Sequence, residues 1–108
     1  MGQYASAVRS LSESLRCDPR NPDVWNWLGV AQTQLGRAGE AAQSFQSALK
    51  LRTNHGPALL NLAVLLDQKL GQPAQALEIY RRYLAFFPNA ANVADVRQTA
   101  EALERSLN

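Results

Sequence analysis

The 108-residue sequence has one cysteine, Cys17, and one histidine, His55. A single cysteine excludes an intrachain disulfide and leaves the redox compartment open. One histidine and one distant cysteine do not make a set of metal ligands, so no metal site is expected. The sequence also has no Gly-rich phosphate loop and no nucleophile placed beside a base. We therefore expect no catalytic residues and no cofactor, and the protein is not expected to be an enzyme.

Long apolar runs and strong charge are missing too. No apolar run approaches the ~18 residues that a membrane span needs, and the N-terminus has no apolar stretch typical of a signal peptide. The net charge is only +2, and no cationic cluster is longer than Arg81-Arg82. We therefore expect neither a membrane nor a nucleic-acid partner. The sequence does not identify a compartment; a soluble, cytoplasmic protein is the expectation.

What the sequence does contain is internal repetition. Hydrophobic residues make up 46 % of the chain, enough for one globular domain with a modest core. A shift of 34 residues places Trp25, Leu28 and Val30 on Leu59, Leu62 and Val64. A shift of 35 places Gly36, Ala41, Phe45 and Leu49 on Gly71, Ala76, Tyr80 and Leu84. Self-similarity at this period indicates stacked helical units, which form extended binding surfaces.

Turn residues divide the chain into six segments with helical spacing of apolar residues. The breaks contain Pro, Gly and Asn, and lie near residues 18–22, 36–39, 54–57, 71–73 and 87–89. We predict one helix at 3–16, helix pairs within 22–51 and 56–86, and a last helix at 90–106. Asn21 can cap the second helix, and Pro22 suits its first position.

Small residues recur beside large ones in these segments. Gly29 and Ala63 hold equivalent places, as do Ala7, Ala41 and Ala76, and Leu11, Phe45 and Tyr80 are the large residues near them. A small side chain lets a neighbouring helix approach closely, and the large one fills the remaining space. This pairing predicts a fixed stacking register. Trp25 and Cys17 are both expected in the core, Cys17 because it aligns with Leu51 and Phe86.

These residues resemble the tetratricopeptide repeat (TPR) family. The matching residues are Trp25, Leu28, Gly29, Ala41, Phe45, Pro88 and Pro19; the departures are Gln32, Thr53, Tyr83 and one extra residue near Gln72. The resemblance implies an all-α solenoid of antiparallel helix pairs in a right-handed superhelix. It implies a single domain over 1–108, with a half repeat at 1–21, repeats at 22–55 and 56–90, and a capping helix at 91–108. Arg97, Gln98 and Glu101 stand where earlier repeats are apolar, as expected of a cap.

The first helix corresponds to the second helix of a pair whose first helix is absent. Three explanations stay open at this point. The chain is cut from a longer protein, its end is naturally open, or a second copy covers that end and makes a homo-oligomer.

In the TPR family the first helix of each pair lines a concave groove, and the second forms the back. Mapped by helical phase, the groove residues are Asp23, Asn26, Trp27, Val30, Thr33, Leu60, Asn61, Val64, Asp67 and Asp95, with Asn92 and Thr99 beside the last. Trp27 is expected to be partly exposed as a partner anchor or packed between first helices. Asn26 and Asn61 could hold a peptide backbone.

The mapped groove is apolar at its centre and acidic at its edges, with no Lys or Arg. This argues against a clamp for a terminal carboxylate, which needs cationic donors. The predicted function is a protein-interaction scaffold whose ligand is a peptide or an amphipathic helix with apolar anchors and some basic residues. Two alternatives remain: an RNA-binding helical repeat, which an acidic groove disfavours, and a structural or self-associating fragment whose working groove lies in other repeats.

Overall fold

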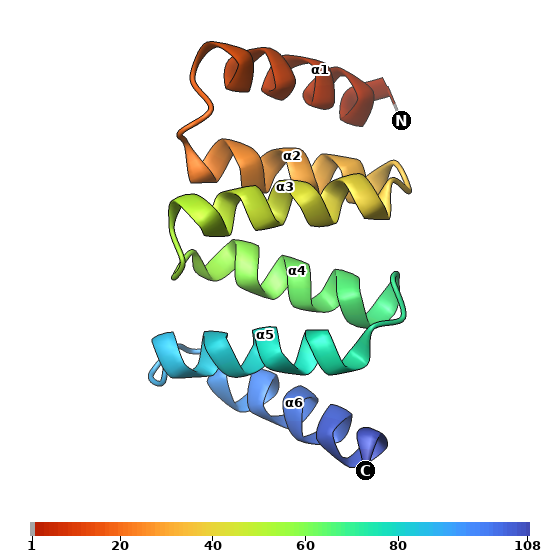
Figure 1. Cartoon of the computed structure of the whole chain (residues 1–108), viewed down its shortest axis with the longest axis vertical. Coiled ribbons are helices and arrows are strands. Elements are labelled where there is room, and N and C mark those ends of the chain that lie inside the picture. The colour runs from red at the N-terminus through yellow and green to blue at the C-terminus, as the bar shows by residue number, and fades with distance from the viewer. Residues whose placement is uncertain (1) are drawn as a thin grey trace.

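The structure is a computed structural model that describes residues 2–108. Six α-helices make up this range, which contains no strand (Figure 1). They are α1 (Gly2–Cys17), α2 (Pro22–Gln34), α3 (Ala38–Leu51), α4 (Gly56–Gln68), α5 (Pro73–Phe86) and α6 (Val93–Leu107). The helices follow one another along an array of 42 × 25 × 21 Å. The prediction of an all-α array of helix pairs is confirmed.

The helix boundaries follow from local chemistry. Asn21 caps α2 by accepting hydrogen bonds from the backbone N–H groups of Asp23 and Val24, and Pro22 occupies the first turn as predicted. After α2, Gly36 has a φ of +76°, and Gly71 after α4 has a φ of +61°. Side chains with a Cβ rarely adopt this left-handed conformation. Glycine at these two positions therefore lets each first helix stop and turn into its partner.

The two pairs differ by one residue in length. The start of α4 lies 34 residues after that of α2, whereas α5 starts 35 residues after α3. The extra residue expected near Gln72 therefore lies in the turn between α4 and α5, where it does not disturb the helical phase.

Two predicted boundaries need correction. The last helix begins at Val93 rather than residue 90, because the backbone first makes turns closed by the N–H groups of Ala90 and Val93. The first helix already includes Gly2, a residue that repeat alignment places in a turn. Met1, the first residue of the predicted half repeat, lies outside the described residues.

The core consists of two clusters of buried side chains. The larger contains residues of α3, α4, α5 and α6 and includes Phe45, Leu59 and Leu65, which are at most 2 % exposed. The smaller joins α1 to α2 through Leu15, Val24 and Leu28. The predicted pairing of small and large residues is present: a Cβ on Gly29 would lie 2.5 Å from the Phe45 ring. That distance is too short for any real contact, so α2 and α3 approach as closely as a glycine permits.

Cys17 and Trp25 are less buried than predicted. Cys17 is exposed, and so are its repeat equivalents Leu51 (43 %) and Phe86 (46 %). The three residues are equivalent in the repeat, as predicted, but all of them are exposed near the ends of the second helices. Trp25 is half-buried against the α1–α2 cluster, and its indole N–H reaches the surface to donate to the Pro19 carbonyl at 2.7 Å.

Contacts run between helices that are consecutive in the chain, with α2 and α4 as the one additional pair. Helix α6 lies on α5 and does not reach α4, although both helices are described in full. Among the helices that begin a pair, α2 and α4 are therefore the two that contact each other. Within residues 2–108, no helix is both long and apolar enough to cross a membrane.

Candidate functional site

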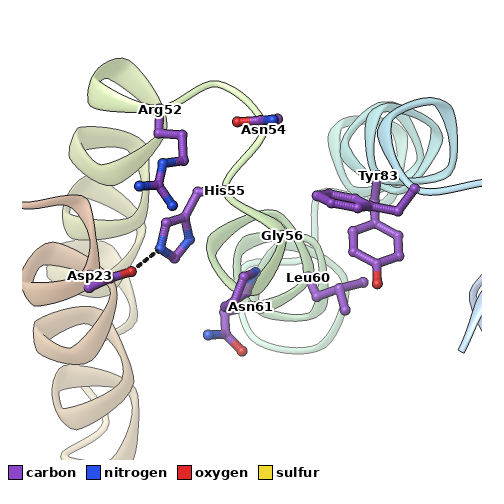
Figure 2. A pocket seen from close by; sticks show the side chains of 10 residues that line it. Asp23, Arg52, Asn54, His55, Gly56, Leu60, Asn61 and Tyr83 are labelled. Atoms are coloured by element: carbon purple, nitrogen blue, oxygen red, sulfur yellow. Dashed lines mark hydrogen bonds and ion pairs between the residues drawn. The ribbon is translucent and has the colours of Figure 1, made fainter. Parts of the chain in front are cut away.

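Of the three hollows within residues 2–108 that are lined in part by residues of α4, two share Asn61. The larger, of about 840 Å³, is shown in Figure 2. It is lined by Asp23, Arg52, Asn54, His55, Gly56, Pro57, Leu60, Asn61, Tyr83 and Phe87. The smaller, of about 170 Å³, lies further along α4 and is lined by Val30, Thr33, Gln34, Phe45, Asn61, Val64, Leu65, Gln68 and Lys69. We call these the large hollow and the small hollow.

The polar wall of the large hollow is built around His55. This side chain is 3 % exposed and precedes α4, where its Nδ1 accepts the backbone N–H of Ala58 at 3.1 Å. Its Nε2 lies 2.7 Å from Oδ1 of Asp23 on α2, the contact drawn as a dashed line in Figure 2. Since Nδ1 accepts, the proton belongs on Nε2, which donates to the carboxylate. His55 therefore caps α4 and links it to α2.

The sequence interpretation missed this role because it placed His55 in a turn without a partner. One signal could have found it. His55 lies 34 residues after Asn21, the residue predicted to cap α2, so both occupy the same capping position of the repeat. The contact with Asp23 joins residues 32 positions apart and depends on how the pairs stack, which repeat alignment alone does not give.

A second polar link joins α2 to α4. Nδ2 of Asn61 donates to Oδ1 of Asn26 at 3.0 Å, and Asn26 is buried. Asn26 therefore serves the junction between first helices rather than presenting itself to a ligand as predicted. Asn61 is half-buried and lines both hollows, and its own carbonyl oxygen remains available to accept a hydrogen bond from a ligand.

Apolar side chains lie open on the same face. Val30 on α2 is 37 % exposed and Val64 on α4 is 40 % exposed, and both line the small hollow. Trp27 is 55 % exposed and lines neither hollow, so of the two predictions made for it, exposure holds and packing between first helices does not. Leu60 is half-buried in the large hollow.

The remaining mapped residues divide into two groups. Thr33 lines the small hollow and donates its hydroxyl to the Gly29 carbonyl at 2.8 Å. Asp67 and Asp95 line neither hollow. Burial, and to a smaller extent the Asp67 carboxylate, raises the pKa of Tyr80 on α5. Asp95 is exposed on α6, the helix that does not reach α4.

The two hollows also contain cations that the mapped groove residues did not include. Arg52 follows α3 and lines the large hollow, and Lys69 follows α4 and lines the small one. The mapping by helical phase covered the first helices only, whereas both cations belong to residues just beyond helix ends. Among residues 2–108, neither cation is within ion-pairing distance of a carboxylate.

Family comparison is consistent with this geometry. Two family models described as tetratricopeptide repeat match residues 1–55 and 33–100. The chain belongs to the tetratricopeptide repeat family. Among curated TPR relatives, it is 31 % identical over 80 residues to superkiller complex protein 3 of Mus musculus, which covers 74 % of the chain. The chain spans 5 % of the length of that relative.

Solved TPR structures share the fold. The TPR2B domain of yeast Sti1, in complex with pHsp70, superimposes with a TM-score of 0.86 at 17 % identity, covering 97 % of this chain and 86 % of that one. The Yersinia enterocolitica chaperone SycD, in complex with a peptide of the translocator YopD, gives a TM-score of 0.88 at 18 % identity, covering 99 % and 84 %. At these identities the likeness concerns the backbone arrangement alone.

Proposed function

We propose that this TPR chain is a protein-interaction module, without catalytic activity, that binds a peptide or an amphipathic helix along the face formed by α2 and α4. The observation that carries the proposal is the exposure of Trp27, Val30 and Val64 beside two hollows on one face. A contiguous apolar patch on the surface of a small domain marks an interaction site, and Val30 and Val64 line one hollow together. An exposed aromatic residue such as Trp27 suits an anchoring role.

The polar links give this face a defined shape. The Asp23–His55 and Asn26–Asn61 contacts hold α2 beside α4, so the hollows exist before a ligand arrives. A preformed surface lowers the entropy lost on binding. The peptide complexes of Sti1 and SycD support the proposal by analogy, since those proteins have the same fold.

The test is a selection from a display library of random peptides, followed by mapping of the selected peptide on the intact chain by amide chemical shifts. We expect shifts concentrated in α2 and α4. Val64→Lys should weaken binding by about tenfold or more, because it places a charge among apolar anchors. Gln75→Lys adds the same charge at an exposed position of α5 and is the matched control. Shifts confined to α3 and α5 would contradict the proposal.

A second candidate is self-association through α1. Ala7 and Leu11 are half-buried, whereas their repeat equivalents Ala41 and Phe45 are at most 1 % exposed. Light scattering tests it. A dimer that Leu11→Glu dissociates would support this candidate, and a monomer at all concentrations would exclude it.

We also propose the division into segments 1–21, 22–55, 56–90 and 91–108, since each boundary lies at or within two residues of a turn.

A further inference from the structure

The charges around the two hollows point to the chemistry of the ligand, on the premise that the proposed function is correct. The two linings together hold two cations, Arg52 and Lys69, and one carboxylate, Asp23. That carboxylate already accepts a hydrogen bond from His55. Both cations are exposed and, within residues 2–108, have no carboxylate at ion-pairing distance. The formal net charge of these three groups is +1, since a hydrogen bond does not cancel the charge of the Asp23 carboxylate.

The positions of the two cations set the length of the peptide segment that could contact both. Arg52 precedes α4 and Lys69 follows it, so they stand at opposite ends of the groove. Helix α4 has 13 residues, and at about 1.5 Å per residue it is about 20 Å long. An extended peptide rises about 3.3 Å per residue, so about six residues span this distance. Between the cations lie the apolar side chains of Leu60 and Val64 and the acceptor oxygen of Asn61.

A chain terminus is not required for recognition. Helix α6 corresponds to the first helix of a pair and does not reach α4. The positions that helical phase maps to its groove side are Asn92, Asp95 and Thr99. No cation on that helix faces the groove at those positions, so a terminal carboxylate has no donor set there. Acidic side chains within a peptide can reach the two cations at the groove ends instead.

We propose that the ligand is an extended peptide segment with an apolar centre and an acidic residue on each side, about five residues apart. One acidic side chain pairs with Lys69 and the other with Arg52, while apolar side chains enter the hollows. This replaces the basic peptide expected from sequence. The carboxylates that favoured a basic ligand are bonded to His55, in the case of Asp23, or lie outside the hollows, as Asp67 and Asp95 do.

Three blocked hexapeptides test the proposal on the intact chain by fluorescence anisotropy. All carry two central Leu residues between Ser residues, and their two end residues are both Glu, both Gln or both Lys. We expect the Glu peptide to bind most tightly and the Lys peptide least, with a difference of about two- to fivefold for each ion pair. Because the pairs are exposed, the difference should shrink as salt rises.

Charge reversal supplies the matched test. Lys69→Glu and Arg52→Glu should each reduce the preference for the Glu peptide, and together they should make the Lys peptide the tightest. Lys50→Glu changes the same charge at an exposed position that lines neither hollow and should leave the order unchanged. If the three peptides bind equally and Val64→Lys abolishes their binding, the acidic preference is overturned. The proposed binding face on α2 and α4 would then still stand. Failure of all three to bind would overturn this inference, while the library selection decides separately on the groove.

Discussion

In the pair α2–α3, the buried Ser44 hydroxyl donates to Oε1 of Gln32 at 2.6 Å. At the equivalent positions of α4–α5 stand Ile79 and Leu66, which are also buried. The two pairs therefore occupy the same position between their helices differently: the first with a polar contact, the second with apolar side chains. Both partners change together, as expected when a lone buried polar group is costly and an apolar replacement of both partners is nearly neutral.

The large and small residues follow the same rule. Gly29 lies beneath Phe45 in the first pair, whereas Ala63 and Tyr80 take the equivalent places in the second. What the repeat preserves from one pair to the next is filled space and satisfied hydrogen bonds, rather than residue identity. Exchanging features between the pairs should therefore test which contacts are interchangeable.

The largest effect is expected from breaking the polar contact on one side only. Gln32→Leu leaves the Ser44 hydroxyl buried without its partner and should lower the free energy of unfolding by about 1–3 kcal/mol. The double variant Gln32→Leu/Ser44→Ile gives the first pair the side chains of the second and should recover most of that loss. Urea unfolding of the wild type, both single variants and the double variant measures the coupling. Additive losses would contradict interchangeability.

Adding one methyl group to the first pair should also destabilise it. Gly29→Ala forces the Phe45 ring to move, and overpacking costs about 1–3 kcal/mol. The better helix propensity of Ala returns at most ~1 kcal/mol, so a net loss is expected. Gly39→Ala is the control, because a Cβ there meets no atom within 4 Å. It should raise the melting temperature, and a similar rise for Gly29→Ala would show that the helices are not in tight contact.

The capping residues offer a finer comparison. Asn21 caps α2 at an exposed turn, whereas His55 caps α4 and also bonds to Asp23. His55→Asn keeps a good capping side chain and loses the bond to α2, with an expected cost of ~1 kcal/mol. His55→Ala should cost about 1 kcal/mol more, since it also removes the cap. Thermal unfolding checks the order, and equal costs for the two variants would leave the cap without a measurable role.

The smallest effect is expected at high pH, where Tyr80 of the second pair stands at the place of Phe45 in the first. Burial raises the pKa of Tyr80 above its ordinary value near 10, with a further contribution from Asp67. The unfolded chain then releases this proton at lower pH than the folded chain, so stability falls as pH rises through about 10. Tyr80→Phe, which resembles the first pair, should lose less stability between pH 8 and pH 11. Parallel melting curves for both proteins would contradict this linkage.

Much of the fold was predictable from the sequence because its determinants are local. The cap at Asn21, the prolines at helix starts and the glycines after α2 and α4 act within a few residues of where they stand. The small and large residues reveal the pairing because the period of the repeat brings them into register. The start of α6 at Val93 escaped prediction because the chain makes additional turns after Phe87.

The candidate site was less predictable, since its contacts depend on how the pairs stack. Asn26 was expected to meet a ligand and instead meets Asn61, 35 residues later. Arg52 and Lys69 lie beyond helix ends, where helical phase says nothing of direction. The mapped residues Val30, Leu60, Asn61 and Val64 do line the hollows, and whether they bind a partner stays a prediction.

The order of helix contacts has a consequence for how the molecule opens. Each helix depends on its immediate neighbours, and α2–α4 is the one contact that skips a helix. Because such contacts close only short loops, any helix pair can nucleate folding, and the neighbouring helices can then add to it one after another. The same pattern lets a terminal helix detach while the centre stays intact. Helix α1, with Leu15 as its one buried residue, should be the first to exchange its amide protons with water.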